Sequence, residues 1–226
     1  MAAYDSELGY VDRELRRLHD SLGWDQATIV LVVSTHGEGL WDRGKVGHGL
    51  SLYDEEIRGL FVLFGPDFKI PEREVSVQTS LVDVMPTLLD ILGLPFQSRD
   101  GLSLLQLLGS RPPVGVFQRF RGRTLYAHHR PQRTLGVAMP HQMVVQGPWK
   151  LISDDAGERL YQRIDDPAEK NDRLADGNPP EGESLRRALG VFEERMGTAR
   201  PTSGAPIPSA AEKIESLLNR TPEGGD

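Results

Sequence analysis

Hydrophobic residues at the start of the chain recur at every third or fourth position, which is the spacing of one face of an α-helix. Charged residues fill many of the positions between them, and Asp5 lies where it favours the positive end of the helix dipole. Gly23 follows the last apolar residue and is a typical helix stop. The pattern therefore predicts an amphipathic helix, and its apolar stripe consists of Tyr4, Leu8, Val11, Leu15, Leu18 and Leu22.

Two apolar runs follow that have no polar face. The first extends from Thr28 to Ser34 and the second from Arg58 to Gly65. Both read as strands that helices cover on either side. A second helical segment, Asp83–Leu92, has Asp83 as its N-cap candidate and ends before Gly93. This order of elements predicts an α/β core with a mostly parallel sheet and helices.

After Leu108 the apolar segments become short and are separated by turn residues. Such spacing predicts a small antiparallel sheet, with strands at Thr124–Ala127, Gln142–Gln146, Trp149–Ser153 and Leu160–Gln162. A charged helix from about Gly182 to Met196 comes next. The expected parts are residues 1–108 as the α/β core, 109–122 as a linker, 123–197 as the antiparallel-sheet subdomain with its helix, and 198–226 as a mostly disordered tail.

Composition narrows the function classes. The net charge of −7 argues against a general nucleic-acid or anionic-membrane surface. The chain has no cysteine, which excludes disulfides, thiolate metal sites and a cysteine nucleophile within it. Its longest aliphatic run, Ile29–Val33, is far shorter than the roughly 20 residues of a membrane span, and no signal peptide is visible at the start. We expect a soluble chain. Its localisation stays open, and the lack of a visible signal peptide favours the cytoplasm.

The segment that is richest in chemistry joins the first strand to two polar turns. The strand ends in Ser34-Thr-His-Gly-Glu38, and a second histidine-bearing loop begins at Gly47-His-Gly. This layout is typical of metal and anion ligands at the end of a strand. Thr35 is unexpected in it, because a carboxylate at that position would be the better metal ligand.

Several segments resemble the sulfatase family in the order in which that family has them. The turn Ser34–Glu38 is similar to the family's Ser-Asp-His-Gly-Glu turn, with Thr35 replacing the aspartate. The other similar segments are Tyr4–Asp12, Gly47–Arg58, Ser80–Pro95, Asp100–Leu104, Trp149–Ile152, Glu158–Tyr161 and Asp165–Glu169. The resemblance implies the C-terminal half of an alkaline-phosphatase-like α/β sandwich with a small antiparallel sheet, and hydrolysis of a sulfate monoester as the parent reaction.

The same resemblance implies roles for individual residues. His48 would contact the substrate sulfate, and Lys45 could reach the same anion, although a solvated loop lysine is the simpler interpretation. His36 would be a ligand of a divalent metal, calcium or magnesium, and Thr35 would be a degenerate ligand position. A neutral hydroxyl replaces a carboxylate poorly, so we expect this chain to hold the metal weakly.

Two adjacent histidines, His128 and His129, lie at the end of a predicted strand, where some sulfatases have residues that border the pocket. Neighbouring side chains of a strand point to opposite faces. The pair therefore cannot chelate one ion together without a bend, and a substrate-rim role and an ordinary surface position both stay open.

Part of the family's catalytic apparatus is not found in these residues. The family has a pair of metal-binding aspartates and a Cys- or Ser-x-Pro-x-Arg motif in its N-terminal half, and no serine here is followed by that pattern. We therefore expect a truncated chain that is inactive alone and leaves a sheet exposed, which a missing half or an oligomer would cover. The expected partner is a small-molecule or glycan sulfate ester. Alternatives are a phosphoester or phosphonate hydrolase of the same superfamily and a non-catalytic paralogue that acts in binding. Family members are often exported.

Overall fold

The structure is a computed structural model that describes residues 2–24, 28–65, 77–97, 100–108, 113–129 and 141–198. The chain forms two compact units, residues 1–192 and 193–226, and each is described by itself. Of the second unit, only the end of the last helix, up to Thr198, is among the described residues. The predicted disordered tail lies outside them from residue 199 onward.

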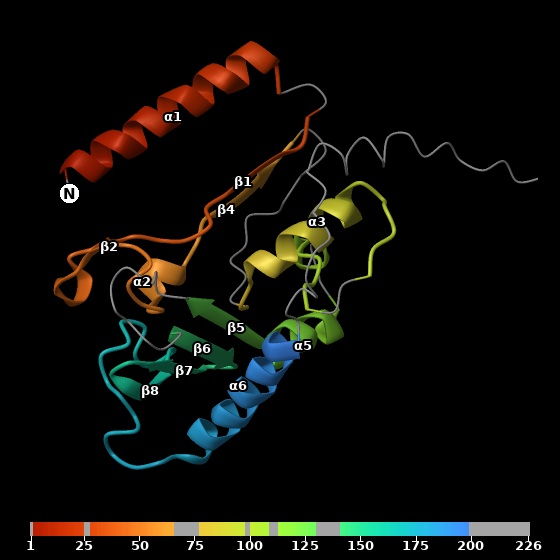
Figure 1. The fold of residues 1–226 in the computed structure, drawn as a ribbon. Coiled ribbons are helices and arrows are strands. Elements are labelled where there is room, and N and C mark those ends of the chain that lie inside the picture. The colour runs from red at the N-terminus through yellow and green to blue at the C-terminus, as the bar shows by residue number, and fades with distance from the viewer. Residues whose placement is uncertain are drawn as a thin grey trace, which may run out of the picture. The chain divides into compact units, whose positions relative to one another are not determined.

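The predicted N-terminal helix is present as α1, Ala2–Leu22, shown in red in Figure 1. Gly23 ends it in the left-handed conformation, at φ +60°, and donates its backbone N–H to the His19 carbonyl oxygen at 3.0 Å. None of its residues is buried, and Leu22 is 59% exposed. The apolar stripe of α1 is therefore open to solvent in the described part of the chain.

Two core strands, β1 (Val30–Val33) and β4 (Phe61–Phe64), pair in antiparallel orientation. Within the described residues this corrects the expectation of a mostly parallel sheet, because β4 starts at the end where β1 stops. Ser34 closes that end: its N–H donates to the Leu60 carbonyl oxygen at 3.0 Å, and its Oγ accepts from the Leu60 N–H at 2.6 Å. A parallel neighbour would instead need a crossover to the opposite end of the sheet.

The connection between these strands forms a compact platform of short elements. A two-stranded ribbon, β2 (Gly39–Leu40) with β3 (Val46–Gly47), encloses the 3-10 turn η1 (Asp42–Gly44). The helical turn α2 (Asp54–Ile57) follows. Helix α2 lies just before the predicted strand Arg58–Gly65, which the structure has as β4.

Along the chain, short helices follow β4 and precede the second sheet: η2 (Leu81–Asp83), α3 (Val84–Ile91), α4 (Leu105–Leu108) and α5 (Val114–Gly122). Helix α5 corrects the expected linker at 109–122, because Phe120 is buried against Leu104 and Leu107. Val116 and Phe117 of the same helix also pack against this cluster. Residues 109–112 lie outside the described residues.

Asp83 does more than start helix α3. Its carboxylate is fully buried, accepts the Ser80 N–H at 2.8 Å in a capping box, and binds both terminal nitrogens of Arg123 at 2.6 Å. It also accepts the Leu102 N–H at 2.8 Å. One carboxylate thus joins the start of α3 to the start of the second sheet.

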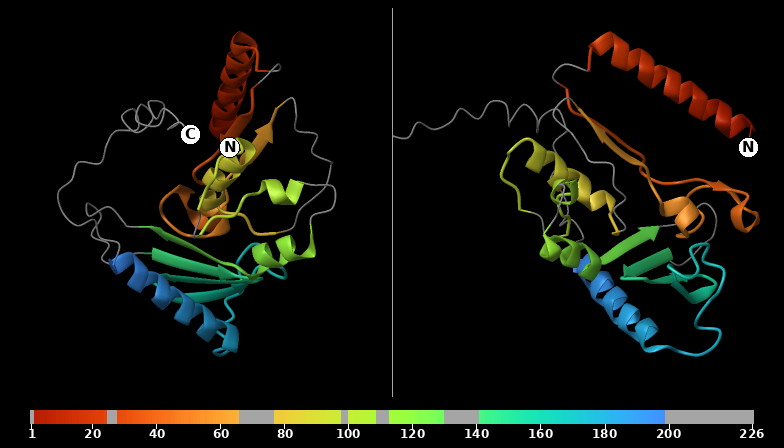
Figure 2. Two further views of the ribbon diagram at one scale, coloured as in Figure 1. Left: turned by 90° about the vertical axis from the view of Figure 1, so that its right-hand side faces the viewer. Right: turned by 180° about the vertical axis from the view of Figure 1, so that it is seen from behind.

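The predicted antiparallel sheet is confirmed as β5 (Thr124–His129), β6 (His141–Gln146), β7 (Trp149–Asp154) and β8 (Gly157–Gln162), hydrogen-bonded in that order. One face packs against α6 (Pro180–Thr198) through Leu185 and Leu189, and Figure 2 shows the helix lying across that face. The opposite face packs against the platform between β1 and β4, where Leu52 joins the buried cluster. The sheet therefore has α6 on one side and the histidine-bearing loop on the other.

None of the described helices combines the length and the apolar composition that crossing a bilayer requires.

Candidate functional site

The two histidines of the sulfatase-like turns meet in the structure. The rings of His36 and His48 stack with 4.0 Å between their centroids and 27° between their planes. His36 donates from Nδ1 to the carbonyl oxygen of Gly37 at 2.7 Å, and His48 donates from Nδ1 to Oε2 of Glu38 at 3.0 Å. Both rings are thereby oriented through Nδ1, which leaves the Nε2 atoms as the positions that can meet a ligand.

A close backbone approach fixes the turn that carries His36. The Gly37 N–H donates to the Glu56 carbonyl oxygen at 2.8 Å, so the turn after β1 is attached to α2. A Cβ atom on Gly37 would overlap the backbone carbonyl oxygen of Glu55. Glycine is therefore required here by space, and this explains the Gly that follows His36 in the motif.

A buried carboxylate organises the loop that carries His48. The Oε2 atom of Glu56 accepts the backbone N–H groups of Leu50 and Ser51 at 2.8 and 3.1 Å, and its Oε1 accepts the Ser51 hydroxyl at 2.5 Å. Glu56 is buried, so these bonds satisfy a charge that would otherwise be costly to desolvate. The sequence interpretation did not single out Glu56. The Asp-Glu-Glu run was visible, but periodicity does not indicate which carboxylate turns inward.

Lys150 of β7 attaches this loop to the second sheet. Its side chain is 0% exposed, and its Nζ lies 2.8 Å from Oδ1 of Asp54 and 2.7 Å from Oε1 of Glu169. Asp54 also binds Arg163 at 2.9 Å through Oδ2, and its backbone N–H donates to Oε2 of Glu169 at 3.0 Å. These four residues form a cluster that we call the Lys150 clamp, and sequence analysis placed Lys150 only within the predicted strand Trp149–Ser153.

The two carboxyl groups of the Lys150 clamp differ in their acidity. Burial would raise the pKa of Asp54, but the neighbouring cations Lys150 and Arg163 outweigh burial and hold that pKa at about 2. Burial raises the pKa of Glu169, and the nearby charge of Asp54 adds to the increase. The difference follows from the geometry, because Asp54 contacts two cations whereas Glu169 is 1% exposed and shares a single ammonium group.

Arg43, which lies between the two strands of the ribbon, also connects the platform to the segment around Glu169. Its guanidinium lies 3.5 Å from the ring centre of Tyr53 and forms a 2.8 Å ion pair with Glu55. It also donates to the backbone carbonyl oxygens of Glu169 and Ala168 at 3.1 and 2.8 Å. The platform is therefore held on the sheet by both Arg43 and the Lys150 clamp, and sequence analysis had not identified Arg43.

Lys45 and Thr35 are the two weaker candidates. The backbone of Lys45 closes the η1 turn, accepting the Trp41 N–H at 2.9 Å and donating to the Asp42 carbonyl oxygen at 3.0 Å, and the residue is exposed. Thr35 is exposed beside His36. Their suggested roles at an anion and at a metal stay predictions.

The residues at the expected metal position do not make a metal site by themselves. No group of three or more histidine, aspartate or glutamate side chains is placed to hold an ion within the described part of the chain. Thr35 and His36 offer a neutral hydroxyl and one imidazole, and the carboxylate of Glu38 is hydrogen-bonded to His48. A hard cation such as calcium requires several oxygen ligands, so this donor set does not fit it.

The adjacent histidines of β5 separate to opposite faces of the sheet, as the strand period predicts. The ring of His128 lies 6.1 Å from that of Phe192 of α6, whereas the ring of His129 lies 5.9 Å from that of its cross-strand partner His141. On this second face, Nε2 of His129 would be 3.6 Å from a Cβ atom added to Gly49. His129 therefore contacts the loop that carries His48.

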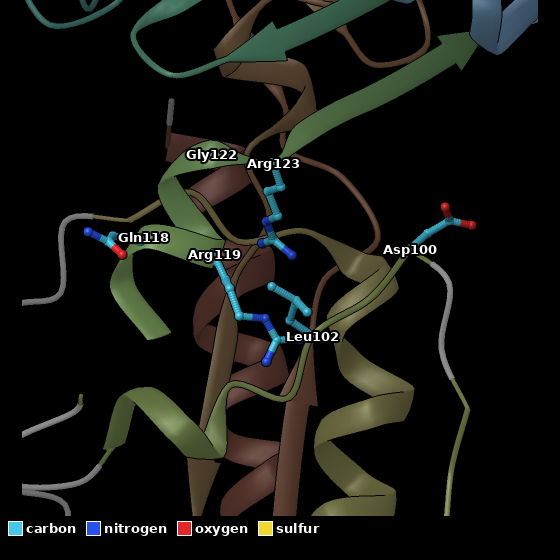
Figure 3. Close-up of a pocket in the computed structure, with 6 residues that line it drawn as sticks. All are labelled: Asp100, Leu102, Gln118, Arg119, Gly122 and Arg123. Atoms are coloured by element: carbon cyan, nitrogen blue, oxygen red, sulfur yellow. The ribbon is translucent and has the colours of Figure 1, made fainter. Parts of the chain in front are cut away.

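A surface pocket of about 390 Å³ lies elsewhere, and Figure 3 shows the residues that line it. They are Asp100, Leu102, Gln118, Arg119, Gly122 and Arg123. Arg123 immediately precedes β5, whereas His129 ends that strand, so about 20 Å of extended chain separates the two. The guanidinium of Arg123 is already bound to Asp83. The pocket is thus remote from the histidines and has a structural rather than a catalytic lining.

Comparison with known proteins agrees with the motif order. The sulfatase family model matches residues 1–94. Arylsulfatase K of Canis lupus familiaris is 38% identical over 183 residues, which are 74% of this chain and 31% of that protein. A Delta 4,5-hexuronate-2-O-sulfatase of Bacteroides thetaiotaomicron is 26% identical over 172 residues, 74% of this chain and 34% of that protein. The chain thus spans about a third of the length of these relatives.

Solved structures support the fold. A protein solved in complex with its substrate D-glucosamine-2-N,6-O-disulfate matches with a TM-score of 0.63 and 22% identity, over 86% of this chain and 40% of that one. A phosphonate monoester hydrolase of Agrobacterium radiobacter matches with a TM-score of 0.58 and 25% identity, over 83% of this chain and 38% of that one. Taken with the family match, these similarities place the chain in the sulfatase family of the alkaline-phosphatase-like superfamily, as a portion that corresponds to the C-terminal part of the family's domain.

Proposed function

We propose that this chain forms the anion-binding side of a sulfatase active site, in which His48 contacts the sulfate of the substrate. The observation that carries the proposal is the stacked pair of His36 and His48, each oriented through Nδ1 by a hydrogen bond. Sulfate ester hydrolysis develops negative charge on sulfate oxygens, and fixed N–H donors stabilise that charge. The imidazolium form of His48 is the one that fits this task, because it carries an N–H on both ring nitrogens: Nδ1 donates to Glu38 and Nε2 donates to a sulfate oxygen.

The surrounding network supports a rigid site. Gly37 allows the close backbone contact that positions His36, and Glu56 holds the loop after His48. The Lys150 clamp fixes this loop on the second sheet through Asp54. Catalytic groups must be held within a fraction of an ångström, and such supporting contacts provide that precision.

These 226 residues alone should not catalyse the reaction. The Cys- or Ser-x-Pro-x-Arg motif does not occur among them, and sulfatases generally use a divalent metal that His36 and Thr35 do not suffice to hold. We therefore expect the nucleophile and most metal ligands to come from residues other than these. His36 would be one ligand of that metal, and Lys45 would be a secondary contact to the anion.

The substrate class that fits best is a sulfated sugar. Relatives include a hexuronate-2-O-sulfatase, and a solved neighbour binds a disulfated glucosamine. Imidazole N–H donors suit sulfate oxygens in such compounds. The identity of the sugar would depend on side chains around the site.

The test is binding of inorganic sulfate to the purified chain, measured by calorimetry and by the ring signals of the histidines in NMR spectra. The His48→Ala variant should lower the affinity about tenfold, since a hydrogen bond to a charged group is lost. His19→Ala, which changes a histidine of α1, is the matched control and should bind as the unchanged chain does. Equal sulfate affinity in the His48→Ala and His19→Ala variants would refute the proposed role of His48.

A turnover assay completes the test. The chain should not hydrolyse 4-nitrophenyl sulfate, with or without calcium. Measurable turnover that disappears in the His48→Ala variant would show that the site is complete, and would refute the part of the proposal that assigns the nucleophile elsewhere.

A phosphonate or phosphate ester is the second candidate substrate, because the Agrobacterium radiobacter neighbour is a phosphonate monoester hydrolase. The same donors would bind a phosphonate oxygen. Comparing the affinities for sulfate and phenylphosphonate decides between the two, and tighter binding of phenylphosphonate would favour this alternative.

A further inference from the structure

His129 of β5 lies against the residue that follows His48. Its Nε2 would be 3.6 Å from a Cβ atom on Gly49, which has a positive φ of 72°. Glycine suits the positive φ, and the 3.6 Å distance is that of an ordinary van der Waals contact between the ring and this part of the loop. A histidine from the second sheet therefore borders the loop of the proposed anion site.

The direction of the His129 ring is set by the strand. Its cross-strand partner is His141, and this face continues through Ala127 and Met143 into the cluster that packs on the platform. His128 points to the opposite face, toward Phe192. Two adjacent residues of the same type thus face different surroundings, and only His129 faces the loop.

The two ring nitrogens of His129 are not equivalent. Nδ1 is buried and has no hydrogen-bond partner among the residues that the structure describes. In the neutral ring one nitrogen carries the hydrogen, and a buried donor without a partner costs free energy. Placing the hydrogen on Nε2 leaves only an unpaired acceptor at Nδ1. This tautomer makes Nε2 a donor at the side of Gly49.

We propose that Nε2 of His129 binds a second sulfate group of the substrate, beside the sulfate that His48 holds. The inference rests on the proposed function of His48. The two histidines reach the site from different elements, His48 from the loop after β3 and His129 from the end of β5. His48 stacks on His36, whereas His129 lies beside Gly49. A sulfate bound at the stacked pair therefore leaves Nε2 of His129 free to bind a second sulfate group. The ligand class is a sugar that carries two sulfates.

The experiment compares three probes on the full chain: inorganic sulfate, glucosamine 6-sulfate and glucosamine 2-N,6-O-disulfate. His129→Ala should lower the affinity for the disulfated sugar about tenfold, as expected when one hydrogen bond to a charged group is lost. Its affinity for inorganic sulfate should stay within twofold of the unchanged chain. His128→Ala is the matched control and should alter neither affinity. His129→Gln, which keeps an N–H donor, should retain most of the affinity and tests the role if the alanine variant fails to fold.

The outcomes separate this inference from the proposed function. If sulfate binds through His48 but the unchanged chain binds the mono- and disulfated sugars equally, the inference on His129 is overturned and the proposed function stands. Equal loss of both ligands in the folded His129→Ala variant would also overturn it, since His129 would then serve the first sulfate. If sulfate binding does not depend on His48, the proposed function fails and the inference falls with it.

Discussion

Replacing Lys150 by methionine removes a cation that Asp54 and Glu169 share. The ammonium group is 0% exposed and bridges carboxylates that are 18% and 1% exposed. Asp54 keeps Arg163, but Glu169 would remain as a buried anion whose ion-pair partner is gone. Removing one partner of a buried ion pair costs about 3–5 kcal/mol, and we expect a loss of this size in the free energy of unfolding at pH 7.

The assay is urea unfolding followed by circular dichroism, with Lys170→Met as the matched control. Lys170 is exposed and lies next to Glu169 in sequence, so its replacement should change the free energy of unfolding by less than about 0.5 kcal/mol. The double variant Lys150→Met/Glu169→Gln removes the stranded charge and should recover part of the lost stability.

The pH dependence of the Lys150→Met defect provides an independent check. Without the ammonium, the pKa of the Glu169 carboxyl should rise further above its unfolded value. A folded state with the higher pKa binds the proton more tightly, so its stability rises as pH falls through that range. The difference from the unchanged chain should therefore be smaller at pH 5 than at pH 7. A loss below 1 kcal/mol, or a loss that grows toward pH 5, would refute the assignment of Lys150 as the partner of these carboxylates.

Three further predictions concern the platform, the short helices and acid stability. The Gly37→Ala variant should lose about 1–3 kcal/mol of stability and also sulfate affinity, because its Cβ would overlap the Glu55 carbonyl oxygen; unchanged urea unfolding would contradict this. The Phe120→Ala variant should lose about 3–5 kcal/mol in the same assay, since the ring is buried between α4 and α5; a loss below 1 kcal/mol would favour a linker there. The pKa of Asp54 is depressed, so its ion pairs contribute fully to the free energy of unfolding above about pH 4, and this contribution is lost as pH falls through about 2. The Asp54→Asn variant should therefore lose less stability in an acid titration than the unchanged chain does.

The family and the element types were predictable because their signals are local. The stripe of α1, the apolar runs of β1 and β4 and the short strands of the second sheet each follow from side-chain period within one segment. The prediction of a linker at 109–122 was wrong because it also rested on local composition. Proline, glycine and arginine dominate its composition, and the packing of Phe120 depends on residues distant in sequence.

The candidate site was predictable in part. The motif identified His36 and His48, but no sequence spacing indicated that their rings stack or that Glu38 and Gly37 orient them. Their contact depends on the turn after β1 closing onto α2, which is a tertiary hydrogen bond.

The amino-acid sequence by itself determined most of the helices and strands, the sulfatase family, and two histidines of the candidate site, because periodicity and motif order are properties of neighbouring residues. Only the tertiary structure decided that β1 and β4 run antiparallel, that Lys150 meets Asp54 across 96 residues of chain, and that His129 rather than His128 faces the His48 loop. Burial, ion pairing and the choice of strand face each depend on which segments pack together.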